Sequence, residues 1–278
     1  MSKRHELQRR IQSLREIANI VDGMSNIAMT EMRKLDRVHK LQHLAVESIT
    51  RALNDVRYHF TAGPPVRNAR PIFILFGSER GFCGAYNDHL IEVLKRQPNH
   101  ELAPVIGIGS RLEVPLKLLR PDALCLPGAA VADEVDAVLG TLVAAVNRIR
   151  QDYFPAQLEV IHFRPEMTEA ICEPILPPAT DSFGANVAPL INFSSEQLLG
   201  ELLEHYLFAI THACFFAALM AENQRRVQHL QEASDHLGKQ LDQLFKQCNV
   251  IRQEEIIEEI EVILLSAELV SPAGIQGP

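Results

Sequence analysis

Apolar or small residues recur at alternating steps of three and four positions in two long stretches, one at each end of the chain. Between residues 1 and 63 the spacing is kept by Leu7, Ile11, Leu14, Ala18, Val21, Met24, Ala28, Met32 and Leu35. Between residues 190 and 271 it is kept by Ile210, Ala213, Ala217, Met220, Val227, Ser234, Leu237, Leu241, Leu244, Cys248 and Ile251. A period near 3.5 residues is typical of helices that wind around each other. A helix of about sixty residues is about 90 Å long, so each helix needs a partner of similar length, and the other end of the chain is the natural one.

Charge indicates how the two predicted helices pair. Residues 1–60 carry eleven Lys and Arg against seven Asp and Glu, whereas residues 194–270 carry five against thirteen. The basic cluster lies at the very start and the acidic cluster near the end: Lys3, Arg4, Arg9, Arg10 and Arg15, and Glu254, Glu255, Glu258, Glu259 and Glu261. Only an antiparallel pair brings these clusters together. Exposed ion pairs contribute only about 0–1 kcal/mol each, so they favour one orientation rather than supply stability.

The middle of the chain alternates between predicted strands and predicted helices. Prolines at 64 and 65 end the first helix. Three apolar runs then read as buried strands: Pro71–Gly77, Val105–Gly109 and Leu158–Phe163. Helical spacing follows the first strand at 88–96 and precedes the third at 133–150, which predicts a small α/β domain with right-handed crossovers. The proline-bearing stretch 165–189 reads as a connection back to the C-terminal helix.

The predicted fold class is an α+β architecture, in which a small α/β, Rossmann-like domain is inserted into a long antiparallel coiled coil of the N- and C-terminal helices. We expect the N-terminal helix at 1–63, the inserted domain at 64–193, the C-terminal helix at 194–270 and a flexible tail at 271–278.

Composition narrows the functional classes. A net charge of −8 argues against a nucleic-acid-binding protein, which would favour a basic surface. Five scattered cysteines without a CxxC pair indicate reduced thiols in a cytosolic compartment. The charged N-terminus predicts no secretory signal, and the apolar run 209–221, interrupted by His212, is too short to span a bilayer.

Catalytic and ligand-binding patterns are weak. The spacing of Gly77, Gly81 and Gly84 fits neither a Walker loop nor a dinucleotide motif, so a tight strand-to-helix connection is favoured over a nucleotide site. Cys83 lies beside Phe82 with no histidine nearby and reads as a packed thiol. Three histidine pairs share a helix face, His39 with His43, His205 with His212, and His229 with His236, but no third ligand is evident. We expect no catalytic residue, no cofactor and no metal.

Three separated segments resemble the gamma subunit of F-type ATP synthases, the central stalk of a rotary motor. The turn 78–87, Ser-Glu-Arg-Gly-Phe-Cys-Gly-Ala-Tyr-Asn, is similar to the family's Ser-Asp-Arg-Gly-Leu-Cys-Gly-Gly-Leu-Asn motif. Near the end, 249–260 is similar to its Asn-x-Ala-Arg-Gln-x-x-Ile-Thr-x-Glu pattern, and upstream Glu222, Arg226 and Asp235 fit a third stretch. The first helix also aligns, from 10 to 34.

Some positions depart from the family's pattern. Asp22 and Glu31 stand where the family usually has Lys, Gly23 stands for Ala, and Glu254-Glu255 replaces Ala-Ala. These differences remove positive charge where the family's shaft contacts acidic parts of the beta subunits. They indicate a divergent branch, such as the alternate F-type ATPases, some of them sodium-translocating, found beside a standard enzyme in some bacteria.

The resemblance implies a non-catalytic rotor subunit that couples ion flow through a membrane ring to ATP synthesis or hydrolysis. Its implied partners are the alpha, beta and epsilon subunits and the membrane c-ring, at the cytoplasmic face of the bacterial plasma membrane, which it reaches only through the complex. Contacts with beta-subunit loops are implied for Asn249, Arg252, Gln253, Arg33 and Lys34. The turn residues implied to be structural are Ser78, Arg80, Gly81, Cys83, Gly84 and Asn87.

Two other functions remain open from the residues alone. The chain could be a coiled-coil scaffold whose sheet domain binds peptides, or an enzyme whose small α/β domain binds a nucleotide. A scaffold would usually self-associate, whereas a rotor is present once per three alpha/beta pairs. A nucleotide would raise thermal stability by mass action.

Overall fold

The computed structural model describes residues 3–60, 70–153, 156–165, 167–176, 178, 190–192 and 194–270. The predicted tail at 271–278 and the predicted end of the first helix at 61–63 lie outside these residues. The chain divides into two compact units, each described here by itself. The terminal unit consists of residues 1–25 and 230–278, and the globular unit consists of residues 26–229.

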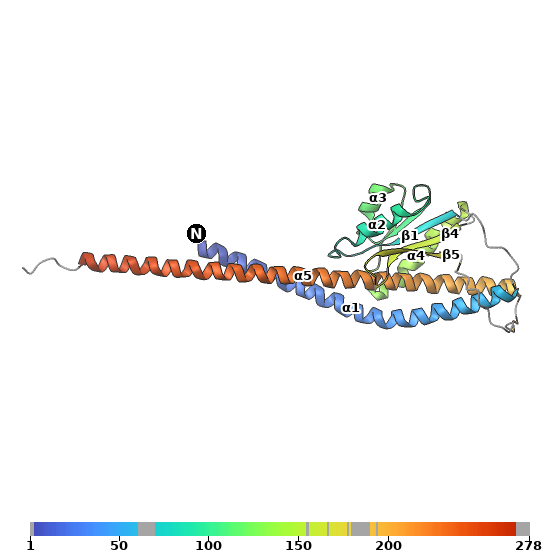
Figure 1. Ribbon diagram of the computed structural model, residues 1–278, viewed down its shortest axis with the longest axis horizontal. Coiled ribbons are helices and arrows are strands. Elements are labelled where there is room, and N and C mark those ends of the chain that lie inside the picture. The colour runs from blue at the N-terminus through green and yellow to red at the C-terminus, as the bar shows by residue number, and fades with distance from the viewer. Residues whose placement is uncertain are drawn as a thin grey trace, which may run out of the picture. The chain divides into compact units, whose positions relative to one another are not determined.

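Two long helices dominate the secondary structure, as the sequence predicts (Figure 1). Helix α1 spans Lys3–Phe60 and helix α5 spans Ser195–Val270. Neither helix contains a proline, the residue that would remove a backbone hydrogen bond and break it. Each helix begins in one unit and continues without interruption into the other.

Contacts inside the terminal unit confirm that the helices pair antiparallel. The Nη1 atom of Arg4 lies 3.1 Å from Oε2 of Glu255, so the basic cluster meets the acidic one. Further along, the guanidinium of Arg15 lies 4.7 Å from the ring centroid of Phe245. Beyond that, the hydroxyl of Ser234 donates to Asp22 at 2.8 Å. As positions in α1 rise, their partners in α5 fall, which is the order of an antiparallel pair.

A five-stranded sheet forms the centre of the globular unit. Its strands are β1 (Arg70–Phe76), β2 (Val105–Ile108), β3 (Leu124–Leu126), β4 (Ala156–Phe163) and β5 (Ala170–Leu176), in the spatial order β3-β2-β1-β4-β5. The first four strands are parallel, and β5 runs antiparallel to β4. Parallel pairs need crossovers, which are supplied by α2 (Tyr86–Arg96), α3 (Glu113–Leu119) and α4 (Val135–Asp152), the last preceded by a short 3₁₀ turn at Ala132–Glu134.

Alternate side chains of the central strands enter two hydrophobic cores. Ile72, Ile74 and Phe76 of β1 pack with α4, with Leu35 of α1 and with residues 214–216, 218 and 219 of α5. Phe73 of β1 faces the other side, where the side chains of α2 and α3 pack. Because both faces are covered, the strands read as continuous apolar runs. The predicted small α/β domain is therefore confirmed, and the first half of α5 is built into it.

Three elements were not expected from the sequence. Strand β3 is only three residues long and is followed by a proline, and α3 is a helix of two turns. The stretch 165–189, expected to be a connection, contains β5, so that prediction is wrong for 170–176. The prediction failed at Pro174, because a proline within an apolar run usually argues against a strand. At a sheet edge its missing N–H is tolerated, and the register of β4 shifts where Pro174 pairs with Glu159.

Among the described residues, α5 is the one helix long and apolar enough, by length and composition, to cross a membrane. Half of its most apolar window is buried inside the fold. Residues 214–216, 218 and 219, at the centre of the apolar run, lie in the core beside the sheet. Packing against the sheet accounts for the apolar character of this part of the helix.

Candidate functional site at the turn after β1

The turn that follows β1 is closed by a pair of hydrogen bonds between its two ends. The backbone N–H of Ser78 donates to Oδ1 of Asn87 at 3.0 Å, and Nδ2 of Asn87 donates to the hydroxyl of Ser78 at 2.9 Å. Ser78 is buried, and Asn87 lies in the first turn of α2. The two residues therefore fix the path from the strand into the helix.

Glu79 ties the turn to the ends of the two neighbouring strands. Its carboxylate accepts hydrogen bonds from the N–H and hydroxyl of Ser110, at 2.9 and 2.7 Å, and from the N–H of Gly128 at 2.7 Å. Burial tends to raise the pKa of Glu79. The bonds from Ser110 and Gly128 and the nearby Arg111 outweigh burial and lower the pKa below its ordinary value.

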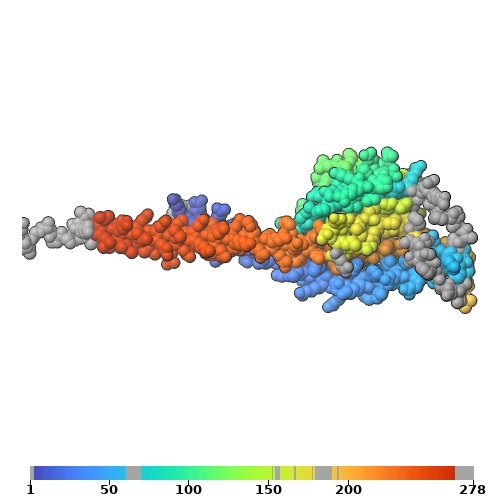
Figure 2. Space-filling view, in the orientation of Figure 1, coloured from blue at the N-terminus to red at the C-terminus, as the bar shows by residue number. Residues whose placement is uncertain are grey.

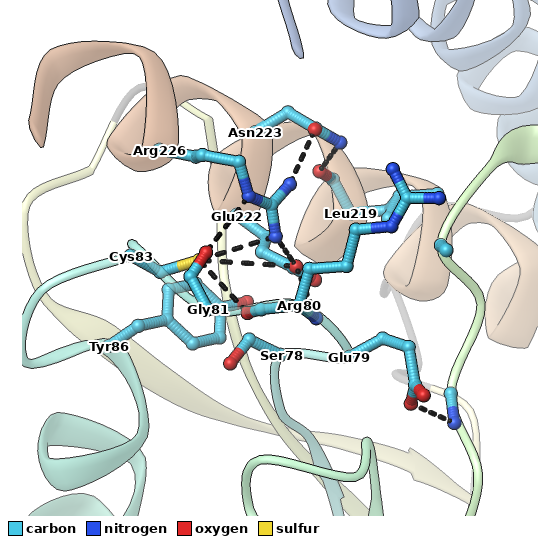
Figure 3. Close-up of polar contacts among 12 residues, drawn as sticks. Ser78, Glu79, Arg80, Gly81, Cys83, Tyr86, Leu219, Glu222, Asn223 and Arg226 are labelled. Carbon is cyan, nitrogen blue, oxygen red and sulfur yellow. Dashed lines mark hydrogen bonds and ion pairs between the residues drawn. The ribbon is translucent and has the colours of Figure 1, made fainter. Parts of the chain in front are cut away.

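A buried ion pair on α5 holds the other side of the turn (Figure 3). Glu222 and Arg226, one helical turn apart, are 3% and 4% exposed, and Nη2 of Arg226 contacts Oε1 of Glu222. Arg226 also donates to the carbonyl of Gly81 at 3.1 Å and to Oδ1 of Asn223 at 2.7 Å. The N–H of Arg80 donates to Glu222 at 3.4 Å. Burial is the largest influence on Glu222 and raises its pKa, although Arg226 opposes the shift.

Cys83 lies at the centre of this cluster as a buried thiol. Its sulfur is 3.4 Å from the carbonyls of Arg80 and Gly81 and 3.4 Å from Nη2 of Arg226. Burial, reinforced by the carboxylate of Glu222, raises the pKa of Cys83 to about 12. A thiol this hard to ionise is a poor nucleophile. The geometry agrees with a packed cysteine rather than a reactive one.

Gly77 and Gly84 in the turn region are glycines for different structural reasons. A Cβ at Gly77 would lie 2.5 Å from the Cβ of Leu112, so no other residue fits there. Gly84 has a φ of +59°, a left-handed conformation that glycine adopts without strain. Phe82, with a φ of +64° and 55% exposed, adopts a similar conformation without being glycine. A Cβ at Gly81 would meet nothing within 4 Å, so crowding does not explain that glycine.

A phosphate-binding turn needs backbone N–H groups that are free to donate to the phosphate. In this turn, such N–H groups donate to the carboxylates of Glu79 and Glu222 instead. The N–H groups of Arg80, Ser110 and Gly128 already donate to Glu222 or Glu79. A bound phosphate would have to displace these carboxylates, which carry the same sign of charge. The arrangement therefore holds the turn against α5 and gives no support to a nucleotide site.

The side chains predicted to bind partners lie on exposed surfaces of both units. Asn249, Arg252 and Gln253 are exposed on α5 in the terminal unit. Arg33 and Lys34 are exposed on α1 in the globular unit, and Lys34 pairs with Glu31 at 2.9 Å. Three of the five residues thus lie on α5 and two on α1.

Two of the acidic residues that depart from the family's pattern, Asp22 and Glu31, have partners inside the chain. Glu31 is only 8% exposed and binds Lys34, and Asp22 accepts a hydrogen bond from Ser234 of the opposite helix. A Cβ at Gly23 would meet nothing within 4 Å. The two carboxylates thus bind neighbouring side chains.

The far end of α5 carries many apolar side chains on its surface, and Figure 2 shows this end in red. Each of the following residues is at least 44% exposed: Ile256, Ile257, Ile260, Val262, Ile263, Leu264 and Leu265. Contiguous exposed apolar residues mark sites of interaction with other molecules. Glutamates at 254, 255, 258, 259 and 261 are interspersed among them.

Glu222 and Arg226 fit a family motif in the sequence, but no sequence pattern indicates that they hold the turn. They lie some 140 positions from Arg80 and Cys83, so no local pattern joins them. One signal was present: a glutamate and an arginine four positions apart directly follow the most apolar part of α5. Charges on a buried helix face need partners, and an i, i+4 pair supplies one.

Two histidines of the same-face pairs, His212 and His43, have contacts of their own. His212 lies 2.8 Å from Asp136 and 3.0 Å from the carbonyl of Phe208, and His43 lies 3.5 Å from Glu47. Across the part of the chain that the structure describes, none of these pairs belongs to a group of three metal-ligating side chains.

Known proteins match the chain over nearly its whole length. The ATP synthase gamma chain of Clostridium botulinum strain Hall is 24% identical over 280 residues, which cover 94% of this chain and 96% of that protein. The ATP synthase gamma chain of Lactococcus lactis subsp. cremoris is 22% identical over 284 residues, which cover 95% and 97%.

Solved structures share the fold. A chain of the rotor of Euglena gracilis mitochondrial ATP synthase superposes with a TM-score of 0.62 at 12% identity, covering 91% of this chain and 98% of that one. A chain from the OSCP/F1/c-ring structure of the same enzyme gives 0.63 at 13% identity, covering 99% and 98%. The ATP synthase family model matches residues 3–270, which include both long helices and the whole sheet. The chain therefore belongs to the ATP synthase gamma family.

Proposed function

We propose that this chain is the gamma subunit of an F-type ATP synthase or ATPase, the central-stalk rotor that couples ion flow through a membrane ring to ATP synthesis or hydrolysis. The observation that carries the proposal is the family match over residues 3–270. It includes the two long helices and the inserted sheet together, so it concerns the whole architecture rather than one motif.

The helices have the properties that a rotating shaft requires. Paired helices that pack along a common seam resist twisting, and inside the terminal unit α1 and α5 pack antiparallel, with contacts that run from Arg4 with Glu255 to Asp22 with Ser234. Inside a ring of three alpha/beta pairs, such a pair of helices presents a different face to each catalytic site. Rotation can then shift each site between conformations, because a partner that binds two states unequally changes their populations.

The exposed end of α5 fits a partner that surrounds it. Apolar residues from 256 to 265 are exposed, although burying each would be favourable by about 1.5–3 kcal/mol. An alpha/beta ring could cover them. Asn249, Arg252 and Gln253 lie just before this segment, and we assign them hydrogen bonds to beta-subunit loops, with Arg33 and Lys34 as further contacts.

The globular unit is assigned to the foot of the stalk, near the epsilon subunit and the membrane c-ring. The chain would be a non-catalytic subunit, since the turn after β1 satisfies its polar groups internally. It would lie at the cytoplasmic face of the bacterial plasma membrane, held there through the complex. Identities near 24% to gamma chains agree with a divergent branch of the family.

Copurification tests this assignment against the scaffold alternative. The tagged full chain, purified from its native membranes and analysed by quantitative mass spectrometry, is expected to bring alpha, beta, epsilon and c subunits with it. One copy per three alpha/beta pairs is expected, because a single shaft occupies the ring. Recovery of self-associated chain without alpha and beta subunits would contradict the rotor and favour the scaffold.

A further inference from the structure

A second polar cluster lies on the face of the sheet that packs against α4, whereas Cys83 of the turn lies on the face covered by α2 and α3. His162 of β4, Glu173 of β5 and Cys214 of α5 each offer one ligand atom, and these atoms all lie within 4.8 Å of one another. His162 and Cys214 are 2% and 3% exposed. Glu173 is partly exposed at the edge strand, so one side of the cluster is open to solvent.

The imidazole of His162 is oriented as a ligand. Its Nδ1 atom lies 3.1 Å from the carbonyl oxygen of Phe163, which can only accept, so Nδ1 carries a proton. Nε2 points toward the cluster and is buried without a hydrogen-bond partner among the described residues. The nearest approach given by Glu173 is 3.8 Å, from Oε2, which is too long for a hydrogen bond. Leaving a buried polar atom unpaired costs about 1–3 kcal/mol.

Glu173 is oriented in the same way. Arg164 contacts its Oε1 atom, while Oε2 faces His162. In metal sites, a ligating histidine usually donates its other ring N–H to a carbonyl or carboxylate, and a ligating carboxylate is itself hydrogen-bonded. The contacts of His162 with Phe163 and of Glu173 with Arg164 are of this kind. His162 and Glu173 thus each contribute one ligand atom to a group that includes Cys214, with all three atoms within 4.8 Å of one another.

We propose that His162 Nε2, Glu173 Oε2 and the Cys214 thiolate bind a Zn²⁺ ion, with water at the fourth position. Zinc takes tetrahedral sites made of nitrogen, oxygen and sulfur ligands at about 2.0–2.3 Å, which places the ligand atoms about 3–4 Å apart. The ligand atoms now lie within 4.8 Å of one another, so they need to approach by less than the length of one zinc–ligand bond. One thiolate and one imidazole favour zinc over magnesium or calcium, which prefer oxygen ligands.

Protons compete with the metal for these atoms. Burial tends to lower the pKa of His162, but Cys214 and Glu173 counteract it, and the pKa is raised to about 9. Zinc binds a deprotonated imidazole nitrogen and a thiolate, so its binding to these side chains would release protons. The bound ion would then join the edge hairpin β4–β5 to α5, two parts of the fold that are far apart in sequence.

Metal binding to the purified full chain tests the site. The chain is loaded with Zn²⁺, dialysed against a weak chelator and analysed for metal content, and we expect close to one zinc per chain. Co²⁺ loaded in its place should give a thiolate-to-cobalt charge-transfer absorption, which histidine pairs elsewhere on the chain cannot produce. Cys214→Ser should abolish this band and weaken zinc binding by at least about 10- to 100-fold.

Cys125→Ser is the matched control, since Cys125 lies in β3 at the opposite edge of the sheet. It should keep both the zinc and the cobalt band. If Cys214→Ser does not fold, as judged by circular dichroism, Glu173→Gln at the partly exposed position carries the same test. A wild-type chain without zinc or the cobalt band, or unchanged binding in Cys214→Ser and Glu173→Gln, overturns the proposal. The result is independent of whether the chain is a rotor.

Discussion

At the scale of single residues, the polar groups of the turn after β1 act as ligands for one another. Glu79 accepts three hydrogen bonds from strand ends, and Asn87 exchanges two with Ser78. A motif of this kind suggests chemistry in a sequence, because glycine, cysteine and charged residues lie close together. In the structure their shared role is to fix the backbone of one strand-to-helix connection.

Glu79→Gln should reduce stability in a pH-dependent way. A hydrogen bond to a charged group contributes about 1.5–3 kcal/mol, so we expect a loss of about 1–3 kcal/mol at neutral pH. The pKa of Glu79 is lowered in the folded state, so its contribution is complete above the ordinary value of 4.5 and is lost as the pH falls through the folded value. The stability difference between wild type and variant should therefore narrow below pH 4.5.

Urea unfolding of the full chain from pH 7 down to pH 3 measures this difference. Glu92→Gln is the control, because Glu92 is an exposed carboxylate on α2 whose nearest cation, Arg96, is 3.9 Å away. It should change stability by less than about 0.5 kcal/mol at any pH. A difference for Glu79→Gln that stayed constant down to pH 3 would show that its charge is not responsible.

At the scale of elements, the sequence predicted those elements whose pattern is local. The 3.5-residue period gave both long helices, and continuous apolar runs gave β1, β2 and β4. Strand β5 was missed because Pro174 is acceptable only at a sheet edge, and the edge is a property of the tertiary fold. The contact between α5 and the turn was not predicted for a similar reason, since Arg226 and Gly81, which form one of its hydrogen bonds, are 145 positions apart.

Arg226→Met should destabilise the globular unit strongly. Removing one member of a buried ion pair typically costs about 3–5 kcal/mol, because the remaining charge stays buried without its partner. Glu222, at 3% exposure, would be that remaining charge. Replacing both members by apolar groups removes this penalty, so the double variant Glu222→Met/Arg226→Met should lose less stability than Arg226→Met alone.

A double-mutant cycle from denaturant unfolding measures the coupling between the two residues. Arg225→Met on the adjacent position provides a comparison, since Arg225 stacks 3.9 Å above the ring of Phe163 and is less buried. We expect its cost to be smaller. Additive losses in the double variant would mean that the ion pair does not hold the turn.

At the scale of the whole molecule, charge distribution predicted the direction of helix pairing and the structure bears it out at Arg4 and Glu255. The same sequence could not reveal that Glu31 and Asp22 bind neighbouring side chains within the chain. Acidic substitutions on a shaft look like lost partner contacts until their own partners are known. The exposed cations that remain, Arg252 above all, are therefore the stronger candidates for contacts with other subunits.

Arg252→Ala should lower coupled ATP hydrolysis or synthesis in the purified complex while assembly survives. Arg252 is exposed, so its loss should change the stability of the chain by less than about 0.5 kcal/mol. If it hydrogen-bonds a beta-subunit loop in one rotational state, the charged hydrogen bond contributes about 1.5–3 kcal/mol to that state. Removing it should slow turnover by about 10- to 100-fold at most, since 1.4 kcal/mol corresponds to a tenfold change.

Lys246→Ala, an exposed cation earlier on the same helix, is the control and should leave turnover unchanged. Equal turnover in both variants at equal subunit content would remove Arg252 from the coupling contacts, while the copurification result would still decide whether the chain is the rotor.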